Sequence, residues 1–209
     1  SFVLMLSNDG TAFDYTPSTV PTSANCRQAI FADLDQDTNL DVVTAQEDGF
    51  VGVFLNQSLT FTEQRFPVSD LEPRVLGAGL LNSDTFPDLF VVSVSDTGPS
   101  ESYTLINDGS GGLGTATSIS GPDFGTPGQV LIGDINLDGV QDVVVVDFDL
   151  FGAGYFLNFG NGLNFEAGTS LVHAGGDLTS PRSAIFADVD GDGVEEPTFA
   201  TAPLDLSFA

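Results

Sequence analysis

Positive charge is almost absent from this sequence. Lys is missing, and four Arg residues face 30 Asp and Glu residues, so the formal net charge is -26. Nucleic acids and anionic lipid surfaces need clustered cations, and we therefore exclude both as expected partners. The charge balance favours a protein that binds cations.

Cysteine, histidine and long apolar runs are also scarce. Cys26 has no partner for an internal disulfide and is interpreted as a small buried residue, and a lone His173 is typical of a solvated loop. No apolar run approaches the roughly 18 residues that a membrane span needs, so membrane insertion is not expected. The chain begins with Ser1 rather than Met, and we expect it to be processed or part of a longer protein.

Apolar residues are nevertheless plentiful, and they are organised in repeats. Hydrophobic residues make up 41% of the chain and include 18 Phe, which predicts a folded core. Four segments share an apolar run, an acidic loop and a second apolar run, and they recur about every 50 residues. They read AIFADLDQDTNLDVVT (29–44), GAGLLNSDTFPDLFV (77–91), LIGDINLDGVQDVVV (131–145) and AIFADVDGDGVEEPTF (184–199).

A second sequence pattern recurs with the same period and predicts further strands. Apolar runs end with Asn at positions 8, 56, 107 and 158, and another strand is expected around Phe13, Phe61, Leu113 and Phe165. Four short strands in a unit of about 50 residues are typical of a β-propeller blade, whereas the coils of a β-solenoid, the alternative, are usually shorter. The sequence predicts an all-β propeller array with a partial blade at 1–26, repeats at 27–73, 74–127 and 128–181, and a partial repeat at 182–209.

The two ends of the chain predict an incomplete ring. The strand type that ends with Asn is expected at Phe2 to Leu6, in the three internal units and again at Leu204 to Phe208, which gives five copies against four acidic loops. We interpret the chain as part of a larger propeller, for example one with seven blades. A strand exchanged between neighbouring chains is the alternative.

The acidic loops carry the ligand pattern of a hard cation. In three of the loops, positions 1, 3, 5 and 9 hold side-chain oxygens, and the backbone carbonyl at position 7 completes a set that calcium prefers. The predicted ligands are Asp33, Asp35, Asp37, Asn39 and Asp41, then Asp134, Asn136, Asp138, Val140 and Asp142, and finally Asp188, Asp190, Asp192, Val194 and Glu196. The second loop has Leu80 at position 1 and is a weak site that retains Asn82, Asp84 and Asp88. About three calcium sites and a degenerate fourth are therefore expected.

Other metal motifs fit less well. An EF-hand would need Glu at position 12, where this chain has Thr44, Val145 and Phe199, and its loop would be flanked by helices. Zinc would need His or Cys ligands. Magnesium stays open as an alternative to calcium.

At these residues the sequence resembles the FG-GAP/VCBS repeats found in the propellers of integrin α-subunits and in many secreted microbial proteins. The motifs FADLDQDTNLDVV, GDINLDGVQDVVV and FADVDGDGVEE carry the resemblance. It implies that each acidic loop joins the first two strands of a blade, with calcium on one face and ligands commonly on the other. Glu196, followed by Pro197, departs from the usual Asp and apolar strand.

Three Arg residues share one repeat position on the face that the resemblance places opposite the calcium loops. Arg27, Arg74 and Arg182 each stand six residues before a loop start. Salt bridging to neighbouring carboxylates is the simple interpretation. Contact with an acidic ligand is the alternative.

We expect a calcium-stabilised extracellular or cell-surface module that binds a glycan or protein and has no catalytic activity. Nearly every patterned Asp belongs to a metal loop, which leaves no carboxylate pair for glycoside hydrolysis. Extracellular modules often bind calcium at about 10⁻⁴ to 10⁻³ M, and this agrees with the expected location. The alternatives are a repeat subunit of a surface filament or layer, through self-association, and an accessory domain attached to a secreted enzyme.

Overall fold

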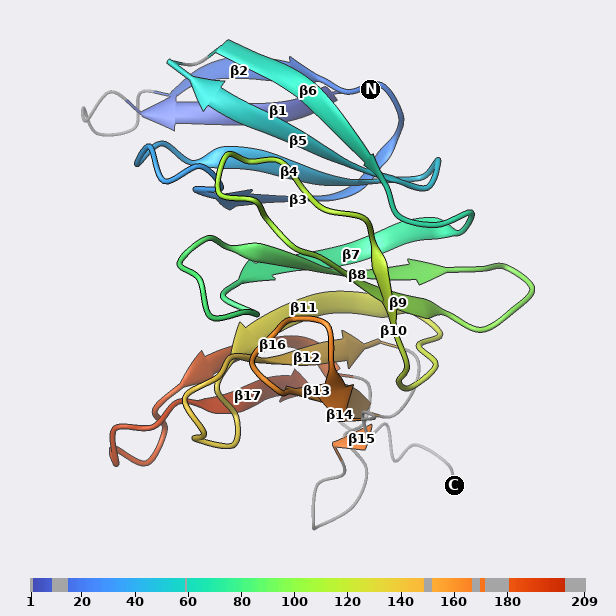
Figure 1. Ribbon diagram of the computed structural model, residues 1–209, viewed down its shortest axis with the longest axis vertical. Coiled ribbons are helices and arrows are strands. Elements are labelled where there is room, and N and C mark those ends of the chain that lie inside the picture. Colours follow the sequence, from blue (N-terminus) through green and yellow to red (C-terminus); the bar gives the residue numbers. More distant parts are fainter. Residues whose placement is uncertain are drawn as a thin grey trace, which may run out of the picture.

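The protein is built from β-strands. The computed structural model describes residues 2–8, 15–58, 60–148, 152–166, 170–171 and 181–201, and none of these residues lies in a helix (Figure 1). The all-β prediction is therefore confirmed for the described residues. This part of the chain likewise offers no helix of the length and apolarity that crossing a membrane requires.

Three antiparallel sheets follow one another along the chain, and in each of them four strands pair in sequence order. The first sheet holds β3 (Cys26–Ala32), β4 (Asp41–Gln46), β5 (Phe50–Gln57) and β6 (Thr60–Pro67). The second sheet holds β7 (Glu72–Gly79), β8 (Asp88–Val94), β9 (Glu101–Leu105) and β10 (Thr117–Ile119). The third sheet holds β11 (Pro127–Gly133), β12 (Asp142–Asp147), β13 (Gly152–Asn158) and β14 (Phe165–Glu166), and β15 (Ser170–Leu171) also pairs with β13.

A two-stranded hairpin precedes these sheets and another follows them. The first contains β1 (Phe2–Asn8) and β2 (Tyr15–Pro21), and the last contains β16 (Pro181–Ala187) and β17 (Glu196–Thr201). One predicted strand is displaced: Leu113 makes only an isolated bridge to Asn107, and the fourth strand of the second sheet is β10. The strands expected around Phe13 and at Leu204 to Phe208 lie outside the described residues.

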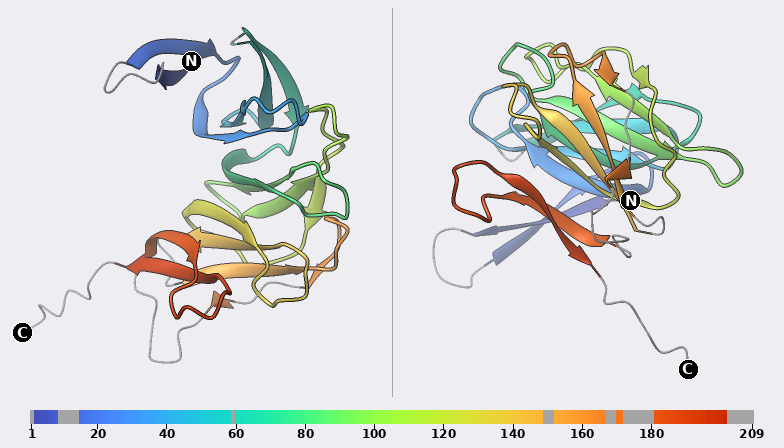
Figure 2. Two further views of the ribbon diagram at one scale, coloured as in Figure 1. Left: turned by 90° about the vertical axis from the view of Figure 1, so that its left-hand side faces the viewer. Right: turned by 90° about the horizontal axis from the view of Figure 1, so that it is seen from below.

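The sheets are arranged along an open arc with their first strands next to one another (Figure 2). Strand β7 contacts β3 and β11, and β11 contacts β16. Side-chain amides connect these strands between sheets. The Leu76 N–H donates to Gln28 Oε1 at 2.6 Å, and Gln129 Nε2 donates to the carbonyl of Ala184 at 2.9 Å. Each sheet is thus joined to the next through its first strand.

The core lies between consecutive sheets, and the second strand of each sheet serves two interfaces. Every residue of β8 is buried because sheets cover both of its faces. Side chains alternate across a strand, so Leu89 packs into the interface with the first sheet while Phe90 packs into the interface with the third. The first strands approach closely enough that a Cβ on Gly77 would lie 2.7 Å from Val130 Cγ1. This stacking fixes the ends of the strands, where the acidic loops begin.

Candidate metal-binding loops

Each acidic loop joins the first two strands of a sheet or hairpin, and all of them lie on the left-hand side of Figure 1. We name them the first loop (33–41), the second loop (80–88), the third loop (134–142) and the fourth loop (188–196). The four loops lie at equivalent places because each of them connects the first strand of its sheet or hairpin to the second.

All four loops share a scaffold of side-chain to backbone hydrogen bonds. The side-chain oxygen at position 3 accepts the backbone N–H of position 5 over 2.7 to 3.3 Å in every loop. The oxygen at position 5 accepts the N–H of position 7 over 2.8 to 2.9 Å. These hydrogen bonds form tight turns, and such turns favour Asp and Asn at positions 3 and 5 with or without a metal.

The first, third and fourth loops have a feature that the second lacks. Their position-1 carboxylate accepts the N–H of position 6 over 2.8 to 3.0 Å. Positions 4 and 6 of these loops are left-handed, with φ between 57° and 92°: Gln36, Thr38, Leu137, Gly139, Gly191 and Gly193. Ser83 and Thr85, at the same positions of the second loop, are not among the described left-handed residues. Leu80 offers no carboxylate around which the backbone can turn.

The first loop fits a metal ion best. Oxygens of Asp33, Asp35 and Asp37 lie within 4.8 Å of one another. Ligands that share a calcium ion at 2.3 to 2.6 Å must be about this close together. Asp33 Oδ1 is also buried and meets no hydrogen-bond donor, as an oxygen available to a cation would. These residues therefore fit the expected group.

The fourth loop brings Asp188, Asp190 and Glu196 within the same limit of 4.8 Å. The longer Glu196 therefore reaches the place that Asp occupies elsewhere, and its Oε2 accepts the Val189 N–H at 3.3 Å. The third loop forms no such carboxylate group among the described residues. Its position 3 is Asn136, whose Nδ2 donates to Asp138 Oδ2 at 2.9 Å. An amide oxygen there would have to complete the ligand set.

The carboxylate at position 9 connects the loop to the third strand. Asp41 is 1% exposed and accepts the N–H groups of Leu34 and Asn56, each at 2.8 Å. Asp142 is fully buried and accepts those of Ile135 and Asn158 at 3.2 and 2.8 Å. Burial raises the pKa of both carboxyls, against the effect of these hydrogen bonds. The sequence predicted a metal ligand at this position, and the structure adds this connecting role.

Among the position-9 Asp carboxyls, the one in the second loop has its pKa raised furthest. Asp88 Oδ1 accepts the Asn107 N–H at 2.8 Å, but the buried Oδ2 has no hydrogen-bond partner. The Leu81 N–H, which corresponds to the Leu34 donor, lies 3.1 Å from the Gly79 carbonyl. Burial raises the pKa of Asp88 to about 6.

Two of the three phased Arg residues take part in ion pairs. Arg27 Nε pairs with Glu72 and lies 3.2 Å from Glu47, and Arg74 Nε lies 3.7 Å from Glu72. Arg182 is exposed, and no ion pair joins it to a described residue. The geometry agrees with the simple interpretation of Arg27 and Arg74, and contact with an acidic ligand stays a prediction. His173 lies outside the described residues.

These features define an all-β repeat protein with acidic loops at one edge of successive sheets. Residues 81–145 match the family model of the FG-GAP-like repeat. The matched segment runs from the second loop through the third loop into β12. The chain therefore contains an FG-GAP-like repeat. A search of curated proteins gave no match.

Proposed function

We propose that the chain is part of a calcium-stabilised β-propeller that acts outside the cell as a non-catalytic binding module. The observation that carries this proposal is the gathering of the Asp33, Asp35 and Asp37 oxygens within 4.8 Å, together with a second carboxylate group in the fourth loop that meets the same limit. All-oxygen ligand sets of this kind suit calcium. Calcium would also reduce the repulsion within a chain of formal charge -26.

The propeller part of the proposal rests on how the sheets are stacked. Four-stranded antiparallel sheets follow one another with their first strands in contact, as blades do around a central axis. The described sheets form an open arc, so the proposal includes further blades that complete the ring (Figure 2). The FG-GAP-like repeat at residues 81–145 supports the same architecture.

A subunit of a surface filament or layer is the second candidate, and the last hairpin favours it. Position 2 of the first and second loops, Leu34 and Leu81, is fully buried. The corresponding Val189 is 64% exposed and Ile185 of β16 is 58% exposed. A surface of this kind suits contact with another repeat, from the same chain or from a neighbour. An assembly that grows with protein concentration at saturating calcium would favour the filament over the binding module.

The test compares thermal unfolding with calcium and after exhaustive chelation. Calcium that binds only the native state adds about 2.7 kcal/mol per site at a hundredfold excess over Kd. Asp37→Asn should lower the calcium-induced rise in Tm. Asp84→Asn is the matched control, because Asp84 Oδ1 makes the same turn, to Phe86 N–H at 2.9 Å, in the degenerate loop. Equal Tm values with and without calcium, or equal losses in both variants, would contradict the proposal.

A further inference from the structure

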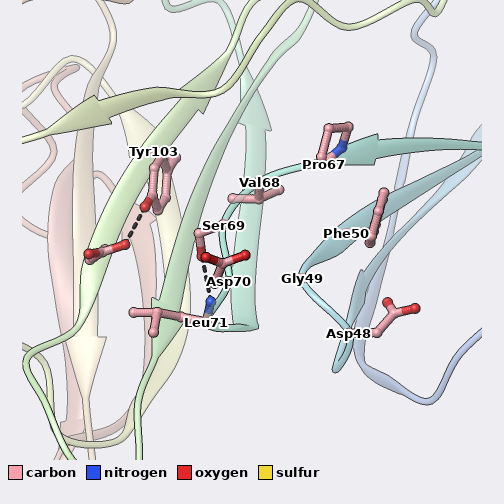
Figure 3. A pocket seen from close by; sticks show the side chains of 10 residues that line it. Asp48, Gly49, Phe50, Pro67, Val68, Ser69, Asp70, Leu71 and Tyr103 are labelled. Atoms are coloured by element: carbon pink, nitrogen blue, oxygen red, sulfur yellow. Dashed lines mark hydrogen bonds between the residues drawn. The ribbon is translucent and has the colours of Figure 1, made fainter.

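A pocket of about 720 Å³ opens between the first and second sheets, at the edge opposite the acidic loops (Figure 3). Its walls come from the β4–β5 turn, the β6–β7 connection and the start of β9. Figure 3 shows Phe50 and Asp48 on one side and Tyr103 on the other, with Ser69 and Asp70 between them. Pockets of this size can hold a small ligand or a long side chain.

Two pairs, each made of an aromatic ring and a carboxylate, line the pocket. An Arg side chain of the protein occupies one of them. The guanidinium carbon of Arg65 lies 4.1 Å from the ring centroid of Phe50, and Arg65 Nη2 lies 2.5 Å from Asp48. This is a cation held by a ring face and a carboxylate together. The arrangement shows that a ring and a carboxylate placed in this way can bind a guanidinium group.

The second pair has no cation of its own. The Tyr103 hydroxyl donates to Glu101 Oε2, and Asp70 contributes a further negative charge near the ring. Among the described residues, no ion pair reaches Glu101 or Asp70. Arg27, Arg65 and Arg74 pair with other carboxylates, and Arg182 does not line this pocket. Glu101 and Asp70 are both exposed, so a cation from outside the chain can reach them.

A hard metal ion fits this second pair poorly. Within the described part of the chain, the only carboxylate groups close enough to share an ion are those of the first and fourth loops. Oxygens of Asp48, Asp70 and Glu101 therefore do not all lie within 4.8 Å of one another, and Phe50, Val68 and Leu71 add apolar groups to the pocket lining. A larger cation with an apolar stem fits this distribution of charge.

The pocket wall is braced by hydrogen bonds that need no ligand. The Val68 N–H donates to the Gly49 carbonyl at 2.9 Å, and the Leu71 N–H donates to Ser69 Oγ at 3.0 Å. Binding therefore requires little ordering of the backbone, which lowers its entropic cost.

We infer that the pocket binds an organic cation, an ammonium or guanidinium group on a short aliphatic chain, between Tyr103, Glu101 and Asp70. The inference rests on the proposed binding function and gives its ligand a chemical class. Arg27, Arg74 and Arg182 do not line this pocket, and the inference reverses the charge expected of a ligand at those residues.

The test uses isothermal titration calorimetry at saturating calcium and about 0.15 M salt, so that the loops are filled and long-range attraction is screened. The probes are agmatine and a blocked Ala-Arg-Ala peptide, each with a neutral counterpart, N-butylurea and the citrulline peptide. Agmatine represents a free small molecule and the peptide represents a partner protein. We expect one or both cations to bind at one site per chain, with the neutral counterparts at least about tenfold weaker.

Variants locate the site. Asp70→Asn with Glu101→Gln should weaken binding about tenfold or more. Tyr103→Leu should weaken it a few-fold and Tyr103→Phe less. Glu166→Gln, which removes an exposed carboxylate in β14, should leave the affinity unchanged. Lack of cation binding, equal affinity for the neutral probes, or equal losses in Glu166→Gln and in the double variant Asp70→Asn with Glu101→Gln would overturn the inference. Calcium-dependent melting, measured on the same variants, tests the metal part of the proposed function separately.

Discussion

Asn107 donates its side-chain amide to the backbone carbonyl of Leu34, 2.8 Å away and 73 residues earlier in the chain. The same Nδ2 donates to the Pro87 carbonyl at 3.0 Å. Asn158 repeats the arrangement, with the carbonyls of Leu81 and Gln141 at 2.5 and 3.0 Å. Asn158 ends β13 and Asn107 lies two residues after the end of β9. Each binds position 2 of the acidic loop in the preceding sheet. Consecutive sheets are thereby joined next to the candidate metal sites.

Asn107→Ala and Asn158→Ala should each destabilise the protein by about 2 to 3 kcal/mol, because each leaves two carbonyl oxygens without this donor. Both Asn residues are almost fully buried. Urea unfolding at saturating calcium measures the effect, and a smaller m-value would show that the sheets unfold less cooperatively. Asn164→Ala, at an exposed position, is the control and should change stability by less than about 0.5 kcal/mol. Equal effects at positions 107 and 164 would mean that the connection contributes little.

The sequence predicted the repeated elements well because period and polarity are local signals. The apolar runs around the acidic loops became β3 and β4, β7 and β8, β11 and β12, and β16 and β17. The sequence also placed Asn107 and Asn158 at strand ends, but there it indicated only a turn. One acceptor of each Asn lies in another repeat, and a pattern along one chain does not identify a partner 73 residues away.

The pocket was missed for a related reason. Phe50, Asp70, Glu101 and Tyr103 do not share one position of the repeat, so a search for residues in phase passes over them. The repeat pattern instead indicated the Arg residues that share one repeat position. In a chain with 30 acidic residues, Arg27 and Arg74 found carboxylates close by. Residues that recur at one repeat position serve a role common to every repeat, whereas a ligand pocket can form where two repeats differ in sequence.

Asp88 should make stability depend on pH. Its folded-state pKa is raised to about 6, mainly by burial, from an ordinary value of 3.8. The native state therefore holds this proton more tightly than the unfolded state, and its stability falls as the pH rises from about 4 through 6. The loss is on the order of 2 to 3 kcal/mol. Asp88→Asn cannot ionise at this position and should avoid the loss.

The measurement is urea unfolding of the wild type and Asp88→Asn between pH 4.5 and 7.5, without added divalent ions. Comparison of the two proteins largely cancels the titration of the other acids. The stability of Asp88→Asn relative to the wild type should increase with pH over this range. A constant difference would show that the Asp88 carboxyl is not perturbed in this way.

Gly49→Ala should be strongly destabilising and should disturb the pocket. Gly49 has φ of 91°, and an added Cβ would lie 2.3 Å from the backbone carbonyl oxygen of Ser69. The left-handed conformation alone costs a non-glycine residue about 1 to 2 kcal/mol. Gly160→Ala is the matched control, because Gly160 has φ of 84° and its nearest contact would be an ordinary 3.5 Å to Val140 Cγ2. We expect Gly49→Ala to lose clearly more stability than Gly160→Ala in urea unfolding, and to lose agmatine binding under conditions where both remain folded. Equal losses of stability would mean that the β6–β7 connection moves aside without cost, and the pocket wall would then be less rigid than its hydrogen bonds to Gly49 indicate.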